Sequence, residues 1–244
     1  MLKPIDHEKR FVIGTPLVGW KCDRNEDMTW LENRLAIHEM FPNSYFFAAL
    51  ELDHRGLEPF QRVLTALEEV DGLYWAYTIN DHQAAVTSEN RWIRIETGRN
   101  LIREYAQREA LDAVLYVDSD IVLNVEIIEK LLEVDHPLVG VDVPQYGLSG
   151  KVVSERPPIQ EHWTTAGMLL VNAPAFYDLP WHHNLYIGLS DDPAFQYMAC
   201  RLQQHWDHGV GDPYGQTWVR KDVKADHRGQ LIAVEQRRIP MREL

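Results

Sequence analysis

Short apolar runs alternate with segments of helical periodicity over the first 145 residues of the chain. Apolar runs bounded by polar residues are typical of buried strands, whereas apolar positions spaced three and four apart are typical of helices. Their alternation predicts an α/β fold with a mostly parallel central sheet flanked by helices. The pattern predicts strands at 11–17, 45–52, 73–79, 113–117 and 138–143, and helices at 30–40, 57–70, 92–108 and 124–134.

The pattern changes after residue 145. Residues 145–163 are rich in glycine, serine, proline and charge, which predicts a mobile loop. A further apolar run predicts a strand at 167–172, and Pro193 fits the first turn of a helix that continues to residue 204. A last strand is expected at 218–226, and we expect one domain over residues 1–244.

Composition places the chain among ordinary globular proteins, with 45% hydrophobic and 25% charged residues. No apolar run is long enough to span a membrane, and the first residues lack the apolar stretch of a signal peptide. Cys22 and Cys200 form no disulfide or metal-binding pattern. We therefore expect a cytoplasmic protein. The net charge of −13 argues against non-specific nucleic-acid binding, although the tail after Val219 is basic.

Two carboxylates follow the predicted strand at 113–117. Side chains two residues apart on an extended chain point the same way, so Asp118 and Asp120 can converge on one point, with Ser119 keeping the turn small. A hard divalent cation such as Mg²⁺ is held by one or two carboxylates together with phosphate oxygens. The pair therefore indicates a site for a cation and a diphosphate, unless the aspartates merely cap the helix that follows.

Polar residues also stand at the ends of the other predicted strands. They are Thr15, Glu51 with Asp53, and Asp81. In open α/β sheets ligands bind outside the carboxyl ends of the strands, so these residues are candidates for framing a ligand. For each residue alone, an ordinary polar strand end explains the sequence nearly as well.

The order of these pieces resembles the nucleotide-sugar glycosyltransferases of the GT-A fold, near the large family 2 group. The resemblance covers roughly residues 10–230, and no dinucleotide-binding or P-loop signature competes with it. The matching features are Thr15-Pro16, Arg99-Asn100, Asp118-Ser119-Asp120, Gly167 with its apolar strand, Asp191-Asp192 before Phe195, and the late His227.

The resemblance implies metal-dependent transfer of a sugar from a nucleoside diphosphate to an acceptor hydroxyl, with an inverting outcome. Asp120 would then bind Mn²⁺ or Mg²⁺ directly, Asp118 would bind the ribose or a water of the ion, and His227 would be a third ligand. A surface histidine is the other interpretation of His227. The implied halves are residues 1–144 for the donor, a UDP- or GDP-sugar, and residues 145–244 for an unidentified acceptor.

The resemblance also implies a donor site. Arg99 would lie near the donor phosphates, with help from Arg103, although Arg99 could equally pair with Glu96 or Glu104 on the surface. The full implied set of donor-binding residues is Thr15, Pro16, Glu51, Asp53, Asp81, Arg99, Asn100, Asp118 and Ser119.

The acidic pair before Phe195 matches the position of the catalytic base. Asp192 would take the proton of the acceptor hydroxyl, but Pro193 departs from the family pattern and leaves Asp191 in competition. A helix N-cap is the plainer role for either aspartate. On the acceptor side the resemblance implies Gly167 and Trp163, and Trp181, His182 and His183 would also border the acceptor.

Other functions stay open at the sequence level. A nucleotidyltransferase could use the same sheet and carboxylates, but it would be expected to carry a glycine-, arginine- and lysine-rich loop after the first strand, which Thr15-Pro-Leu-Val-Gly-Trp lacks. A non-catalytic nucleotide- or sugar-binding module would keep its function without Asp192. A metal-dependent hydrolase is a weaker alternative.

Overall fold

The computed structural model describes residues 4–79, 88–142, 160–161, 167–172, 174–182, 195, 217–224 and 226–227. The first part of the chain forms β1 (Phe11–Val18), α1 (Gly19–Asp23), η1 (Glu26–Leu31), α2 (Arg34–Met40), β2 (Ser44–Glu51), η2 (Glu58–Phe60), α3 (Gln61–Glu68), β3 (Leu73–Tyr77), α4 (Ser88–Arg108) and β4 (Ala113–Val117). The rest forms β5 (Ile121–Val122), α5 (Val125–Leu132), β6 (Leu138–Asp142), β7 (Gln160–Glu161), β8 (Met168–Val171), η3 (Pro174–Asp178), β9 (Thr217–Lys224) and β10 (Asp226–His227).

The central sheet has eight strands in the order β3-β2-β1-β4-β8-β6-β9-β7. Strands β3, β2, β1 and β4 run parallel, as do β6 and β9, whereas β8 is antiparallel to both of its neighbours. A second small sheet pairs β5 with β10. The predicted α/β architecture with a mostly parallel sheet is therefore confirmed.

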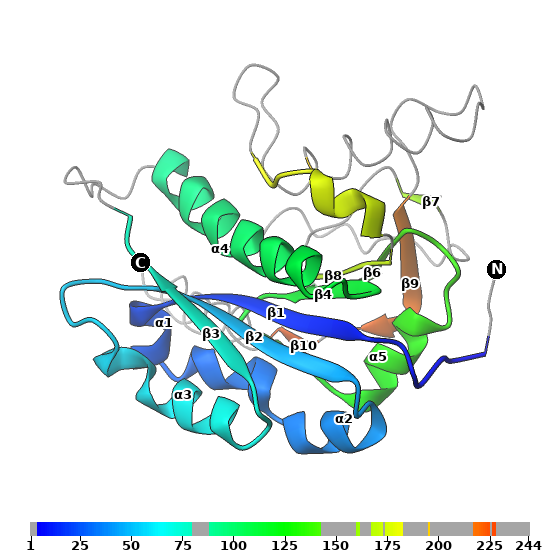
Figure 1. Cartoon of the computed structure of the whole chain (residues 1–244), viewed down its shortest axis with the longest axis horizontal. Coiled ribbons are helices and arrows are strands. Elements are labelled where there is room, and N and C mark those ends of the chain that lie inside the picture. The colour runs from blue at the N-terminus through cyan, green and yellow to red at the C-terminus, as the bar shows by residue number, and fades with distance from the viewer. Residues whose placement is uncertain are drawn as a thin grey trace, which may run out of the picture.

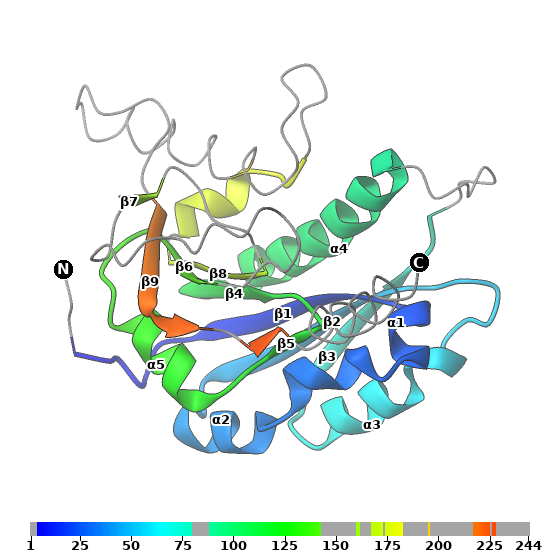
Figure 2. The same cartoon turned by 180° about the vertical axis from the view of Figure 1, so that it is seen from behind.

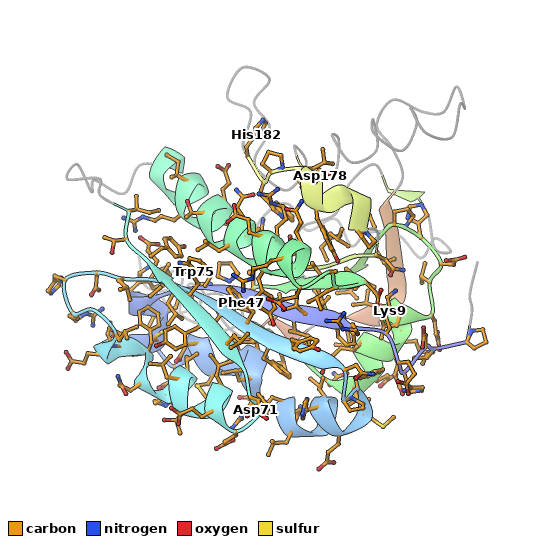
Figure 3. The ribbon with its side chains drawn as sticks, viewed as in Figure 1. Lys9, Phe47, Asp71, Trp75, Asp178 and His182 are labelled. Carbon is orange, nitrogen blue, oxygen red and sulfur yellow. The ribbon has the colours of Figure 1, made fainter. Side chains whose placement is uncertain are left out.

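Helices cover both faces of the sheet. Figures 1 and 2 show α4 and η3 on one face, and α1, α2, α3 and α5 on the other. Alternate residues of β1 serve the two layers: Phe11 and Ile13 belong to the core beneath α2, α3 and α5, and Val12 belongs to the core beneath α4. On the α4 side, Phe47 of β2, labelled in Figure 3, stacks on Tyr105 with ring centroids 4.8 Å apart. This two-sided burial explains the nearly continuous apolar runs of the central strands.

Two glycines let α4 lie close to β1. A Cβ atom on Gly98 would stand 2.6 Å from the Cβ of Pro16, and one on Gly14 would stand 2.3 Å from the side chain of Ile102. Real Cβ atoms do not approach this closely, so both positions require glycine at the observed spacing. The close approach brings the middle of α4 over the carboxyl ends of β1 and β4, where the candidate site lies.

The predicted helix at 30–40 differs most from the structure within the described residues. The chain forms η1 and then α2, and Asn33 between them has a left-handed backbone with φ of 62°. An L-residue in this conformation cannot continue a right-handed helix, so the break falls there. The predicted helix at 124–134 is confirmed as α5, whose Asn124 side chain caps the backbone N–H of Ile127 at 2.9 Å. In the described part of the chain, no helix combines the length and the apolar character that crossing a bilayer requires.

Candidate functional site

The carboxyl ends of four parallel strands meet at one edge of the sheet. There β1 continues into α1, β2 ends at Glu51, β3 ends at Tyr77, and β4 leads into the Asp118–Asp120 turn. Ligands of open α/β sheets bind at this edge because side chains from several strands converge there. The candidate site is built on it.

The Asp118–Asp120 turn is held in place by hydrogen bonds through its backbone. The N–H of Asp118 donates to the carbonyl of Gly167 at 2.8 Å, and the N–H of Ile121 donates to the carbonyl of Asp118 at 3.0 Å. The hydroxyl of Thr29 donates to the carbonyl of Ser119. These three hydrogen bonds fix the backbone of the turn. The sequence analysis argued the convergence of the two carboxylates from an extended chain, whereas the structure has a turn at Ser119 and Asp120, so the convergence stays a prediction.

Asp118 pairs with a buried guanidinium. The Nη2 atom of Arg99 lies 3.3 Å from Oδ1 of Asp118, and the Arg99 side chain is only 3% exposed. Arg99 belongs to α4 and directly follows Gly98, the residue that packs against Pro16 of β1. The residue predicted to lie near donor phosphates therefore lies beside the predicted cation site.

An aromatic stack supports Arg99. Its Cζ atom lies 4.6 Å from the ring centroid of Trp181, and Trp181 stacks on Phe195 at 4.1 Å with 6° between the ring planes. Tyr116 of β4 meets Trp181 edge-on at 4.9 Å. Trp181 is thus a buried platform for the Arg99 guanidinium, and its predicted place beside the acceptor stays a prediction.

Asp120 pairs with Lys21, a residue that the sequence analysis did not select. The Nζ atom of Lys21 lies 3.3 Å from Oδ2 of Asp120, and their side chains are 22% and 15% exposed. Lys21 belongs to α1, the helix that directly follows β1. The sequence feature that could have pointed to Lys21 is its position three residues after the end of the first strand. That strand ends at Val18, one residue later than predicted.

His227 is placed near the turn through its backbone. Strand β10 pairs with β5 so that His227 stands opposite Ile121, the residue after Asp120. This pairing joins two segments more than 100 residues apart. The side chain of His227 lies outside the described part of the structure, so its predicted role as a metal ligand stays a prediction.

The carboxylate oxygens of the turn are the kind of ligand that a hard divalent cation takes together with phosphate oxygens. Among the side chains that the structure describes, no group of three or more His, Cys, Asp and Glu residues comes together. The two carboxylates of Asp118 and Asp120 are oxygen donors on one short turn, and a cation of the Mg²⁺ type takes one or two such groups plus diphosphate oxygens. Two such oxygen donors would suit a cation that takes its remaining ligands from a diphosphate.

Glu51 forms a second carboxylate–guanidinium pair against α4. Its Oε1 atom lies 3.2 Å from Nε of Arg94, and burial raises the pKa of the Glu51 carboxyl, opposed by the charge of Arg94. The other oxygen, Oε2, is buried without a hydrogen-bond partner among the described residues. Tyr77 lies nearby, and its hydroxyl donates to the carbonyl of Arg94 at 3.0 Å. Glu51 thus retains an acceptor atom at the edge where the donor is expected.

Asp53 lies in an exposed ion-pair network. Arg55 binds Asp53 at 2.7 Å and Asp23 at 2.9 Å, and hydrogen bonding to Arg55 lowers the pKa of the Asp53 carboxyl. The network covers Gly19, where a Cβ atom would stand 3.1 Å from Arg55. The predicted donor contact of Asp53 would have to compete with Arg55.

Several residues predicted to bind the donor instead hold the scaffold together. The Thr15 side chain is fully buried and its hydroxyl donates to the carbonyl of Val117 at 2.7 Å, which joins β1 to β4. The Asn100 amide exchanges two hydrogen bonds of 2.9 Å with the backbone of Trp181. In this structure both side chains thus have a positioning role, and their predicted contacts to the donor stay predictions. Pro16 packs against Gly98, and the Ser119 side chain is buried.

The remaining predicted residues fall into two groups. Within the described residues, the Arg103 guanidinium donates to the carbonyl of Tyr177 at 2.7 Å, so it anchors η3, and Gly167 supplies the carbonyl that holds Asp118. His182 is exposed on the α4 side of the sheet (Figure 3). The predicted residues that lie outside the described part of the chain are Asp81, Trp163, His183, Asp191 and Asp192.

Comparison with sequences identifies no relative. No family model matches the chain, and no curated protein matches it. Comparison with solved structures finds a mannosyltransferase, PcManGT from Pyrobaculum calidifontis, in complex with GDP-Man and Mn²⁺. The two structures share 8% sequence identity and a TM-score of 0.50, and the match covers 100% of this chain and 61% of that chain.

Two further structures show the same kind of likeness at lower TM-scores. The galactosyltransferase LgtC, in complex with donor and acceptor sugar analogs, matches with a TM-score of 0.42 and 15% identity over 84% of this chain and 68% of that chain. The glycosyltransferase GlyE of Streptococcus pneumoniae matches with a TM-score of 0.41 and 15% identity over 88% of this chain and 45% of that chain. The chain thus spans about three fifths of the length of the mannosyltransferase, and it has the GT-A type of fold.

Proposed function

We propose that the chain is a metal-dependent glycosyltransferase that moves a sugar from a nucleoside diphosphate to an acceptor hydroxyl. The observation that carries the proposal is the Asp118–Asp120 turn, fixed at the carboxyl edge of a GT-A-type sheet between Arg99 and Lys21. Mn²⁺ or Mg²⁺ bound there would act as a Lewis acid on the departing diphosphate.

The residues of the chain would divide the work between binding and proton transfer. Asp120 and Asp118 would hold the cation, with His227 as a third ligand supplied by β10. Arg99 would donate hydrogen bonds to phosphate oxygens, a role that suits the planar guanidinium. Glu51 would accept a hydrogen bond from the nucleoside through its free oxygen.

The proton of the acceptor hydroxyl would pass to a carboxylate. We assign this role to Asp192, with Asp191 as the competing candidate, and we expect inversion at the anomeric carbon. Support comes from the sequence position of the pair, which shortly precedes Phe195, the residue stacked on the Trp181 platform of Arg99. Trp163 is proposed to line the acceptor side.

A donor-hydrolysis screen tests the proposal. The wild-type chain is incubated with UDP-, GDP- and TDP-sugars and Mn²⁺, beside the variants Asp120→Asn and Asp112→Asn. We expect release of nucleoside diphosphate from one donor, with a rate at least roughly 100-fold lower in Asp120→Asn because about 3 kcal/mol of charge stabilisation is lost. Asp112 lies at the opposite end of β4, where its carboxylate accepts from the backbone of Arg10 at 2.9 Å, so its variant should retain the rate.

The screen can also reject the proposal. Equal rates in wild type and Asp120→Asn would contradict a catalytic cation on this turn. Binding of a sugar nucleotide without turnover under any condition would favour a non-catalytic binding module. If no sugar nucleotide is bound or turned over, the proposed reaction class is wrong.

A further inference from the structure

Lys21 flanks the turn on which the proposed function rests, but that proposal gives its side chain no role. Its ammonium lies 3.3 Å from Oδ2 of Asp120, the carboxylate proposed to bind the cation directly. A cation bound to this carboxylate would therefore meet a positive charge that is already in contact with it. Two cations that need one carboxylate repel each other, and the repulsion is strong in a partly buried site.

The backbone of Lys21 is held close to β1, whereas its side chain is flexible. Helix α1 follows β1 directly, and two of its residues, Gly19 and Cys22, are buried. The lysine ammonium stands at the end of a flexible four-carbon stem, so it can leave Asp120 without any movement of α1.

The other carboxylate of the turn is held differently. Arg99 is almost completely buried between Asp118 and the ring of Trp181. The planar guanidinium is confined by this stack, so Arg99 is a fixed partner. Among the cationic side chains that the described residues place against the turn, Arg99 and Lys21, the lysine is the one that can be exchanged.

We propose that Lys21 occupies the cation position of Asp120 until the divalent cation binds, and then donates to the diphosphate of the donor. The inference rests on the proposed function, because it takes the diphosphate from there. It assigns Lys21 two effects of opposite sign: the ammonium weakens cation binding to the free protein and strengthens diphosphate binding to the cation-loaded protein.

Because the expected effects on cation binding and on diphosphate binding have opposite signs, both are measured on variants of the full chain. Mn²⁺ binding without nucleotide is measured by electron paramagnetic resonance, and binding of GDP and UDP at saturating Mn²⁺ is measured by calorimetry. We expect Lys21→Met to bind Mn²⁺ about three- to fivefold more tightly, the range of a partly exposed ion pair. The same variant should bind the preferred diphosphate about tenfold more weakly, because one charged hydrogen bond is lost.

Three further variants serve as controls. Lys21→Arg keeps the charge and should change both constants less than Lys21→Met. Lys130→Met removes a charge from α5, where Lys130 lies 3.9 Å from Glu133, and should leave both constants at wild-type values. Lys21→Gln repeats the neutral substitution should Lys21→Met fold poorly.

The outcomes separate this inference from the proposed function. Should both neutral variants leave Mn²⁺ binding unchanged or weaken it, while Asp120→Asn abolishes it, Lys21 does not compete for the site and only this inference fails. Should no variant, nor the wild type, bind Mn²⁺ with or without a nucleoside diphosphate, the metal-dependent function fails as well.

Discussion

The ion pairs on the two sides of the Asp118–Asp120 turn differ in depth. On the α4 side, each pair has one deeply placed partner, because the side chains of Arg99 and Glu51 are 3% and 10% exposed, and Arg99 is stacked on Trp181. On the α1 side, Lys21 and Asp120 are both partly exposed, and Arg55 joins Asp23 and Asp53 in a more exposed network. Burial makes a broken pair costly, whereas an exposed pair contributes little and is screened by salt. The α4 side therefore sets geometry, and the α1 side can rearrange.

Removing the platform of Arg99 should have the largest effect on stability. Trp181→Ala leaves a cavity under Arg99 and between Tyr116 and Phe195, so we expect the free energy of unfolding to fall by about 3–5 kcal/mol. Urea unfolding measures the change. Trp75 on the edge strand β3 is 48% exposed (Figure 3), and Trp75→Ala should change the same quantity much less. Similar losses in the two variants would contradict a platform role for Trp181.

The close approach of α4 to β1 should have the next largest effect. Gly98→Ala places a Cβ atom against Pro16, so α4 must shift, and we expect a loss of about 1–3 kcal/mol in unfolding free energy. The neighbouring Thr97 is less buried, and its hydroxyl donates to the carbonyl of Ile93 at 2.7 Å. Thr97→Ala should stay within about 0.5 kcal/mol of the wild type. Gly98→Ala at wild-type stability would show that α4 has freedom to move.

The buried Glu51 should make stability depend on pH. Its pKa in the folded chain is raised by burial, so the folded state binds a proton more tightly than the unfolded state. The wild type should therefore lose stability as the pH rises from about 4.3, the ordinary glutamate pKa, through the folded-state pKa. Glu51→Gln, which has no proton to lose, should lack this component when urea unfolding is compared at pH 4.5 and pH 7. A steeper pH dependence in the variant would contradict the assignment.

The exposed network on the α1 side should show the smallest effect. Arg55→Gln breaks the contacts to Asp53 and Asp23, yet we expect the smallest change of the four in unfolding free energy, because solvent screens these charges. The change should shrink further in 1 M salt, in contrast to Trp181→Ala. A large, salt-independent loss would show that the network is as rigid as the α4 side.

The sequence predicted the elements whose periodicity is local. The apolar run at 113–117 and the acidic turn after it appear as β4 and the Asp118–Asp120 turn, and the helical spacing around Gly98 appears as α4. These features depend on residues near one another in the chain. For the same reason the fold class was confirmed, and among the described helices the largest difference is the break at Asn33. The predicted helix from Pro193 to residue 204 lies outside the described residues except for Phe195.

The parts of the site that the sequence missed depend on contacts between distant segments. Lys21 meets Asp120 across 99 residues, and Asn100 holds the backbone of Trp181 across 81 residues. The periodicity of apolar and polar residues does not reveal contacts between segments so far apart in the sequence. Thr15 was selected because it stands near the end of a strand, and only the pairing of β1 with β4 reveals that its hydroxyl donates to the carbonyl of Val117.

Anomalous diffraction from a crystal grown with Mn²⁺ and the nucleoside diphosphate of the preferred donor tests the central claim most directly. The account predicts a manganese peak at the Asp118–Asp120 turn, within about 2.5 Å of a carboxylate oxygen of Asp120 and in contact with the diphosphate. A structure with the diphosphate bound at this edge of the sheet, and Asp120 still paired with Lys21 with no manganese at the turn, would contradict it.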